Sequence, residues 1–255
     1  MSWKSISTLF INILLFVSCE IDNYDAPDGG LYGQILDIET GEAVPQPVPS
    51  DFGLRLRFYE AGRDNSLEQH FYAQTDGSFR NSRIFNGPVR LVVEQRNFFP
   101  VDTLLVQIQG QTKRNILVLP YARVSIDHAS VNQQLITVRF SINRSEQVAT
   151  GNYEIVQCNL LWNVSPYIDN QTANYAGFYS LLLSANNQEL DLSTADNQAQ
   201  LRRLANVIQG NDNRIYLRIC VITEDKTDSA LYYNYSEIVP VQLNIQSFLN
   251  TLQCN

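Results

Sequence analysis

The residues with the clearest chemical potential in this chain are tyrosines that stand among amides and acids, in the segments 166–179 and 231–235. Aromatic rings can pack against the apolar C–H face of a sugar, and neighbouring amides or carboxylates can bond its hydroxyls. The alternative is that these rings cover sheet edges or contact a second domain. The candidate glycan-binding residues are Tyr167, Asn170, Tyr175, Tyr179, Tyr232, Tyr233 and Tyr235.

Catalytic chemistry has no comparable set of residues. The chain contains two histidines, His70 and His128, and neither is spaced with carboxylates as a metal site would require. The sequence also lacks the patterns of a serine-hydrolase elbow, a zinc-protease helix and a phosphate-binding glycine loop. We therefore predict a protein that is not an enzyme and that uses no metal or cofactor. A hydrolase working through two carboxylates is the weakest alternative, because most acids here stand in turns.

The first eighteen residues predict export. Lys4 supplies a positive start, an apolar run covers residues 9–17, and the run is too short for a good membrane-spanning helix. Cys19 follows directly, and this layout resembles a bacterial lipobox, although Phe16 stands where leucine is usual. The resemblance implies that residues 1–18 are a lipoprotein signal peptide and that Cys19 is acylated, which would anchor the mature protein in membrane lipid.

The residues after Cys19 predict a flexible tether. Residues 19–30 hold acids followed by proline and glycine at low hydrophobicity, a composition that favours a solvated chain. The stretch Glu20–Asp25 resembles the acidic export signal of Bacteroidetes lipoproteins. That resemblance implies a lipid-anchored protein on the outer membrane, facing the cell exterior.

Charge and composition exclude one large class of function. Removing the leader leaves 237 residues with 17 basic and 26 acidic side chains, a net charge of −9. Such a charge, with no basic stripe, argues against nucleic-acid binding and against electrostatic attachment to anionic lipid. The chain is 44% hydrophobic and 11% aromatic, which is enough to build packed cores.

Two segments of alternating residues predict the elements that would position these side chains. In residues 31–120, Leu54, Leu56 and Phe58 alternate with Arg55, Arg57 and Tyr59, Val89, Leu91 and Val93 alternate around Arg90 and Val92, and turn residues separate the runs. Such period-two runs indicate antiparallel strands. We therefore predict an all-β protein made of two tandem antiparallel β-sandwiches, the second covering residues 121–255.

The second predicted sandwich contains strands and one helix. Its expected core strands carry Ile136, Val138, Phe140 and Ile142; Val156, Cys158, Leu160, Trp162 and Val164; and Ile215, Leu217, Ile219 and Val221. Residues 201–208 have helical spacing, and Gly210 suits the end of a short inserted helix.

The alternation in these strands bears on a possible disulfide and on a possible sugar-stacking role of Trp162. Cys158 is expected in the core and Cys220 on the opposite face of its strand, so a disulfide between them is not expected. Cys254 adds a third cysteine whose pairing the pattern leaves open. Trp162 has the phase of a core residue, which argues against a sugar-stacking role.

The order of the motifs resembles known modules. Gly30–Asp37, then Thr40-Gly41-Glu42, Thr75-Asp76-Gly77-Ser78-Phe79 and Asn86-Gly87-Pro88 resemble the carboxypeptidase-regulatory or transthyretin-like domain. The segments Tyr216–Val221 and Tyr235–Val241 resemble the last strands of a fibronectin type III domain. Members of both families are structural or binding modules.

The leader and the two modules together resemble a family of Bacteroidetes surface lipoproteins catalogued as a domain of unknown function. Its members are often encoded beside an outer-membrane porin and a glycan-binding lipoprotein of starch-utilisation-type systems. The resemblance implies a non-catalytic surface lipoprotein that assists the binding or presentation of a polysaccharide to such an uptake complex. The alternative is a protein–protein adhesion or assembly module of an outer-membrane complex.

Overall fold

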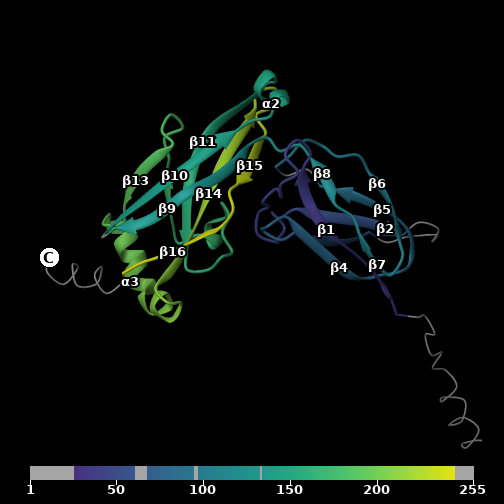
Figure 1. Ribbon diagram of the computed structural model, residues 1–255, viewed down its shortest axis with the longest axis horizontal. Coiled ribbons are helices and arrows are strands. Elements are labelled where there is room, and N and C mark those ends of the chain that lie inside the picture. The colour runs from purple at the N-terminus through teal and green to yellow at the C-terminus, as the bar shows by residue number, and fades with distance from the viewer. Residues whose placement is uncertain (1–25, 61–67, 95–96, 133, 245–255) are drawn as a thin grey trace, which may run out of the picture.

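The computed structural model describes residues 26–60, 68–94, 97–132 and 134–244. These residues form two β-sandwiches that lie side by side along the longest axis of the molecule (Figure 1). The predicted all-β sandwich class is confirmed. The leader, Cys19, most of the tether and Cys254 lie outside the described residues.

The first sandwich consists of two sheets of four strands that enclose one hydrophobic core. In one sheet β1 lies between β4 and β7 and also pairs with β8, and the other sheet has the order β3-β2-β5-β6. Their bounds are β1 (Gly29–Asp37), β2 (Arg55–Glu60), β3 (Gln69–Tyr72), β4 (Ser78–Ile84), β5 (Gly87–Val93), β6 (Leu104–Ile108), β7 (Gln111–Lys113) and β8 (Ile116–Val118).

The alternation predicted for this sandwich is confirmed in β2 and β5. Leu56 and Phe58 of β2 are buried, as are Val89, Leu91 and Val93 of β5. One feature differs from the expectation, because β1 pairs in parallel with β7 and β8. A parallel pair needs a long crossover, and here most of the domain lies between the paired strands, so no local pattern reveals the pairing.

The second sandwich packs a three-stranded sheet, β13-β10-β9, on a five-stranded sheet, β12-β11-β14-β15, in which β16 also pairs with β14. A short α2, the 3-10 helix η1 and the longer α3 connect strands. Their bounds are β9 (Arg123–Asn132), β10 (Leu135–Asn143), α2 (Glu146–Thr150), β11 (Tyr153–Asn163), η1 (Thr172–Asn174), β12 (Gly177–Ser180), β13 (Asn187–Asp191), α3 (Ala195–Gly210), β14 (Arg214–Asp225), β15 (Leu231–Tyr235) and β16 (Val239–Gln242).

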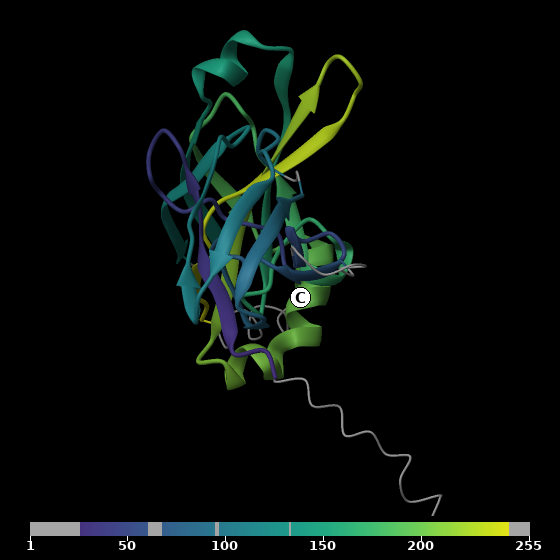
Figure 2. The same cartoon turned by 90° about the vertical axis from the view of Figure 1, so that its right-hand side faces the viewer.

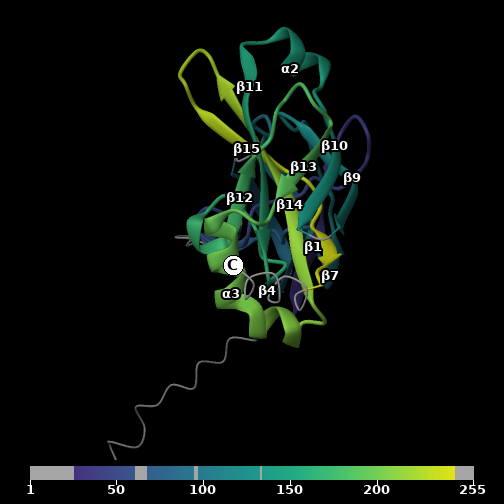
Figure 3. The same ribbon diagram turned by 90° about the vertical axis from the view of Figure 1, so that its left-hand side faces the viewer.

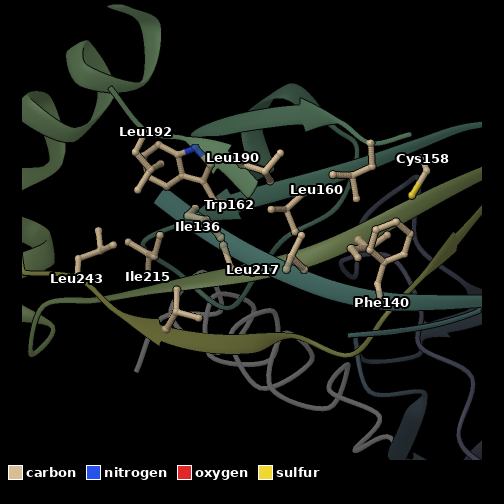
Figure 4. Packing of buried hydrophobic residues seen from close by; sticks show 14 of the residues in the cluster. Ile136, Phe140, Cys158, Leu160, Trp162, Leu190, Leu192, Ile215, Leu217 and Leu243 are labelled. Carbon is tan, nitrogen blue, oxygen red and sulfur yellow. The ribbon is translucent and has the colours of Figure 1, made fainter. Parts of the chain in front are cut away.

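The core between these sheets contains the residues that the strand phases predict, with one exception (Figure 4). Trp162 is fully buried there, and its Nε1 donates to Asn197 Oδ1 at 3.2 Å. Val156 was expected beside Cys158 in the core but is 41% exposed. The register of β11 against β14 shifts between Ile155 and Gln157, so a β-bulge turns Ile155 toward the core instead.

The predicted helix is present and longer than expected. It begins at Ala195 and buries Leu201, Ala205 and Ile208, and the N–H of Asn211 closes its end by bonding the carbonyls of Val207 and Ile208. It lies on the side of the second sandwich that faces away from the first (Figures 1 and 3). Within the described residues, no helix is both long and apolar enough to cross a membrane.

The two described cysteines are free and lie on opposite faces of the five-stranded sheet, as predicted. Cys158 belongs to the sandwich core, and Cys220 belongs to a second cluster on the outer face, with Leu161, Ile168 and Tyr235. Burial raises the pKa of each thiol to about 12. Both thiols are therefore protonated and inert at neutral pH.

The outer face of β14 is also buried, because the first sandwich and the loop after β11 cover it. Every residue from Leu217 to Thr223 is buried, although one face of β14 already packs in its own sandwich. Figure 2 looks onto the first sandwich, with α2 and the β14–β15 hairpin projecting beyond it. This buried face of β14 holds the two domains together.

Candidate functional site at the domain junction

Arg218 lies at the centre of the junction and is fully buried on the outer face of β14. Its Nη2 donates to the carbonyls of Gln46 and Thr75 in the first domain, at 2.8 and 3.2 Å. Its Nη1 donates to the carbonyl of Ile168 at 2.6 Å, and its Nε donates to that of Ser236 at 3.0 Å. One guanidinium therefore connects four backbone carbonyls from two domains.

The charge on Arg218 is compensated by carbonyl dipoles and by an aromatic ring. Burial lowers the pKa of Arg218 to about 10, so the group stays charged at neutral pH. Its Cζ lies 4.5 Å from the ring centroid of Tyr235, a cation–π contact. A buried cation is costly unless its donors are satisfied, so these contacts define the relative position of the domains.

Buried backbone segments from both domains meet next to Arg218. We use "the bridge" for Gln46 and Pro47 of the first domain together with Ile168 and Asp169 of the second. Asp169 Oδ2 accepts from the N–H of Val48 at 3.0 Å, and its Oδ1 accepts from Gln171 N and Asn174 Nδ2, each at 2.9 Å. These bonds also order the loop 166–175, which contains most of the first predicted tyrosine group.

The Phe52 pocket, a cavity of about 340 Å³, borders the bridge at Pro47. Phe52 contributes a ring that is 60% exposed. No charged side chain from the described part of the chain lines the pocket. The lining residues are Pro47, Phe52, Asn170, Gln171, Leu231, Tyr232, Tyr233 and Tyr235.

The Tyr167 pocket is a second cavity, of about 540 Å³, that is also formed by both domains. The ring of Tyr167 is 58% exposed. Two carboxylates line this pocket, Asp76 from the first domain and Glu237 from the second. The lining residues are Ala43, Pro45, Gln74, Thr75, Asp76, Ser78, Pro166, Tyr167, Tyr216, Glu237 and Ile238.

The bridge sets a short distance between the two pockets. Pro45 lines one pocket and Pro47 the other, and two residue steps span at most about 7 Å. On the second domain Tyr167 lines one pocket and Asn170 the other, and three steps span at most about 11 Å. The two pocket walls therefore come within about 7 to 11 Å of each other at these residues.

A third junction cavity, of about 440 Å³, lies beside Asp37 and Arg123. Arg123 joins the domains by donating to both oxygens of Asp37 and to Glu39. Burial raises the pKa of Asp37, but hydrogen bonds from Arg123 and the Glu39 N–H outweigh burial and hold it below its usual value. The buried Tyr235 is the one ring among the described residues that line this cavity, so it offers no stacking surface.

The structure brings together only part of the predicted set. Asn170, Tyr232, Tyr233 and Tyr235 line the Phe52 pocket, and Tyr167 lines the other. Tyr235 differs from the expected exposed ring, because it is only 2% exposed; its hydroxyl donates to Asn170 Oδ1. Its ring packs against Arg218, and the residue also lines the Phe52 pocket.

Tyr175 and Tyr179 line neither pocket, contrary to the sequence-based grouping. The hydroxyl of Tyr179 accepts from Asn197 Nδ2 at 2.7 Å and donates to the carbonyl of Asp191 at 3.1 Å. Burial raises the pKa of this hydroxyl. Tyr175 packs against the outer cluster, with its ring 5.8 Å from that of Phe178. For these two residues the alternative prediction, that the rings cover a sheet edge, describes their positions.

Tyr232 has a double role. Its ring stacks on that of Tyr121 at 4.1 Å with an interplanar angle of 19°. Tyr121 in turn packs against Phe99 and Tyr153, with centroids 4.6 and 5.1 Å away. Tyr232 therefore joins an aromatic cluster that stiffens the junction, and it also contributes to the pocket wall.

Sequence reasoning missed Phe52, Gln171, Asp76, Tyr216 and Glu237. Phe52 stands in the proline-rich connection 44–53, where an apolar ring among turn residues is a weak indication of exposure. Asp76 was assigned to a turn, and it does serve one, because its Oδ1 accepts from the N–H of Ser78 at 2.9 Å. Only the docking of the domains turns these residues into pocket walls. Among the described residues, no cluster of three or more metal-ligating side chains is present.

Solved structures share this fold over most of the chain. A DUF3823 family protein from Bacteroides ovatus is 23% identical, with a TM-score of 0.64 over 86% of this chain and 100% of its own. A DUF3823 family protein from Parabacteroides merdae is 20% identical, with a TM-score of 0.67 over 86% and 100%. A protein from Bacteroides uniformis, named a candidate carbohydrate binding protein, is 21% identical, with a TM-score of 0.62 over 85% and 100%.

No curated protein matches the chain in sequence. Residues 29–119 match the family described as the N-terminal domain of a protein of unknown function (DUF3823). These bounds enclose β1 to β8 and the whole first hydrophobic core. Residues 29–119 are therefore similar to the N-terminal domain of the DUF3823 family, which agrees with the expected resemblance to a family of unknown function.

Proposed function

We propose that this protein binds a glycan, without catalysis, at the junction of its two domains. The observation that carries the proposal is the Phe52 pocket, in which an exposed ring, tyrosines and two amide side chains surround an uncharged cavity. Rings and amides are the groups that a sugar needs for stacking and for bonding its hydroxyls. The carbohydrate-binding name of one structural neighbour agrees with this proposal.

The wall of the Phe52 pocket supports binding rather than catalysis at this pocket. Within the described chain, the wall contains no carboxylate, histidine or cysteine, so it offers no general acid, general base or nucleophile of the usual kinds. Arg218 and the bridge hold the wall in place before a ligand arrives, which lowers the entropic cost of binding.

The experiment that tests this function is affinity gel retardation of the mature protein on amylopectin, laminarin, xylan, galactan and mannan. At least one glycan should retard the protein without releasing sugar. Phe52→Ala should weaken binding to that glycan about tenfold, because covering roughly half of the ring contributes about 1.4 kcal/mol.

Phe178→Ala is the matched control, since Phe178 is 52% exposed and lines neither junction pocket. The control variant should bind as the unaltered protein does. Retardation that survives Phe52→Ala, or that is lost equally in Phe178→Ala, contradicts the site. Absence of retardation on every glycan contradicts the function and leaves the protein–protein assembly alternative.

The proposed cellular address rests on the sequence alone. We infer acylation of Cys19 and attachment to the outer membrane, with the junction facing the cell exterior, from the leader and the acidic tether. A porin and a glycan-binding lipoprotein of an uptake complex are the partners that this address suggests. An anchored binder of this kind would raise the local concentration of polysaccharide beside the complex.

A further inference from the structure

The Tyr167 pocket has features that the proposed function does not use. Its wall contains an exposed ring, a half-buried second tyrosine and the amide of Gln74, which is again a sugar-binding set. It differs from the Phe52 pocket in carrying Asp76 and Glu237. No basic side chain from residues 26–60, 68–94, 97–132 or 134–244 lines either pocket.

We propose that the Tyr167 pocket is a second subsite for the same glycan chain and that its carboxylates favour uncharged sugars. The inference rests on the proposed function and deepens it by naming the substrate class. The ligand would be a neutral polysaccharide, and chains rich in uronate or sulfate would bind more weakly.

The two carboxylates are available to a ligand. Asp76 Oδ1 accepts from the N–H and the hydroxyl of Ser78, at 2.9 and 2.7 Å, and this holds the carboxylate in place. Its Oδ2 has no hydrogen-bond partner in the described chain. Glu237 is exposed and forms no ion pair there. Free carboxylate oxygens accept hydrogen bonds from sugar hydroxyls but repel another carboxylate.

The backbone of the turn at Gly77 links this subsite to the domain junction. Gly77 adopts a φ of +80°, and a Cβ there would lie 2.7 Å from the carbonyl oxygen of Val44, so only glycine suits this turn. The same turn supplies the Thr75 carbonyl that Arg218 bonds. Asp76 is therefore positioned by the turn whose Thr75 carbonyl takes part in the contact that joins the domains.

The expected discrimination is modest and depends on salt. Two carboxylates about 7 Å from a uronate would weaken its binding roughly fivefold at low ionic strength. Near 0.15 M salt, where the Debye length is about 8 Å, the effect should fall to about twofold. Discrimination that does not fall with salt would have another cause.

The test compares a neutral oligosaccharide from the retained polysaccharide with its uronate-substituted counterpart, by calorimetry at about 10 mM salt, where screening is weak. Tyr167→Ala should weaken binding of the long neutral oligosaccharide about tenfold and leave binding of its disaccharide unchanged. Asp76→Asn with Glu237→Gln should strengthen binding of the acidic counterpart roughly fivefold, because the amides keep an acceptor and remove the charge.

The control is the pair Asp102→Asn and Glu189→Gln, which changes the net charge equally at exposed positions outside both pockets. If this control strengthens acidic binding as much, the charge of the whole protein is responsible and the inference is overturned. If Phe52→Ala weakens binding but Tyr167→Ala does not, the second subsite is overturned while the proposed function stands. If the unaltered protein binds neither oligosaccharide, both fail.

Discussion

The junction depends on two arginines that use different chemistry. Arg218 is fully buried and bonds carbonyls from both domains, so losing it would leave acceptors such as Gln46 O and Ile168 O unsatisfied. Arg123 is nearer the surface and pairs with Asp37, whose side chain is 4% exposed, and with Glu39. The hydrogen bonds from Arg218 to backbone carbonyls do not depend on pH. The ion pairs of Arg123 weaken when the carboxylates of Asp37 and Glu39 become protonated.

The sign of that response follows from Asp37. A carboxyl group whose pKa is lower in the folded state contributes stability that is present above the unfolded value, near 3.9, and is lost as the pH falls through the folded pKa. We expect Asp37→Asn to lower the free energy of unfolding by about 1 to 2 kcal/mol at neutral pH and to do progressively less below about pH 4.

Urea unfolding of both proteins between about pH 3 and pH 7 measures this effect. Asp102→Asn, which removes an exposed carboxylate far from Arg123 in the chain, should leave the curve unchanged. A constant difference between Asp37→Asn and the unaltered protein at every pH would show that the Arg123 pair does not stabilise the junction.

At the scale of elements, three pieces of the second domain meet around one glycine. Gly177 begins β12, and a Cβ added there would lie 2.3 Å from Trp162 Nε1 on β11 and 2.9 Å from Asn197 Oδ1 on α3. The hydrogen bond between those two atoms would have to break or move. The close approach explains why strand, strand and helix can share one core.

Gly177→Ala should therefore destabilise the protein by about 1 to 3 kcal/mol, the usual cost of overpacking. Trp162 is the one tryptophan after the predicted leader, so its fluorescence reports directly on the altered contact. Gly210→Ala is the matched control, because Gly210 is the last residue of α3, no heavy atom lies within 4 Å of the added Cβ, and alanine has a higher helix propensity than glycine. Equal unfolding curves for Gly177→Ala and the unaltered protein would mean that the backbone shifts freely at this contact.

At the scale of the whole molecule, the domains form one body whose pockets lie between them. Neither pocket exists in one domain alone, since each wall contains residues from both. The net charge of −8 also opposes attachment to anionic lipid, so the proposed membrane address depends on the proposed acylation of Cys19. If Cys19 is acylated, the ten residues from Cys19 to Asp28 can span at most about 36 Å between the lipid and the first domain.

The anchor leads to a prediction for the whole chain expressed in a Bacteroides host. The unaltered protein should partition into the detergent phase and incorporate labelled fatty acid, and Cys19→Ala should do neither, because the acyl chains would supply the membrane affinity. Cys220→Ala controls for loss of a cysteine at a buried site. Labelled fatty acid in the Cys19→Ala protein would rule out this residue as the anchor.

The fold class and the core-facing residues of the alternating strands follow from the sequence pattern. Alternation in β2, β5, β10 and β14 identified the residues of these strands that face the sandwich cores, because burial of one sheet face imposes a period of two on the chain. The opposite faces of Cys158 and Cys220 followed from the same rule. The β-bulge at Val156 did not, since an inserted residue leaves no mark on composition.

Which polar and aromatic residues line the candidate site depends on how the two domains dock. Tyr167 and Asn170 were found from local chemistry, yet Tyr175 and Tyr179 have the same local character and are used in packing. Phe52 and Asp76 belong to a different domain from the tyrosines that they face. These pocket walls combine residues more than ninety positions apart, at a junction held together by Arg218. Local periodicity carries no information about which residues meet at that separation.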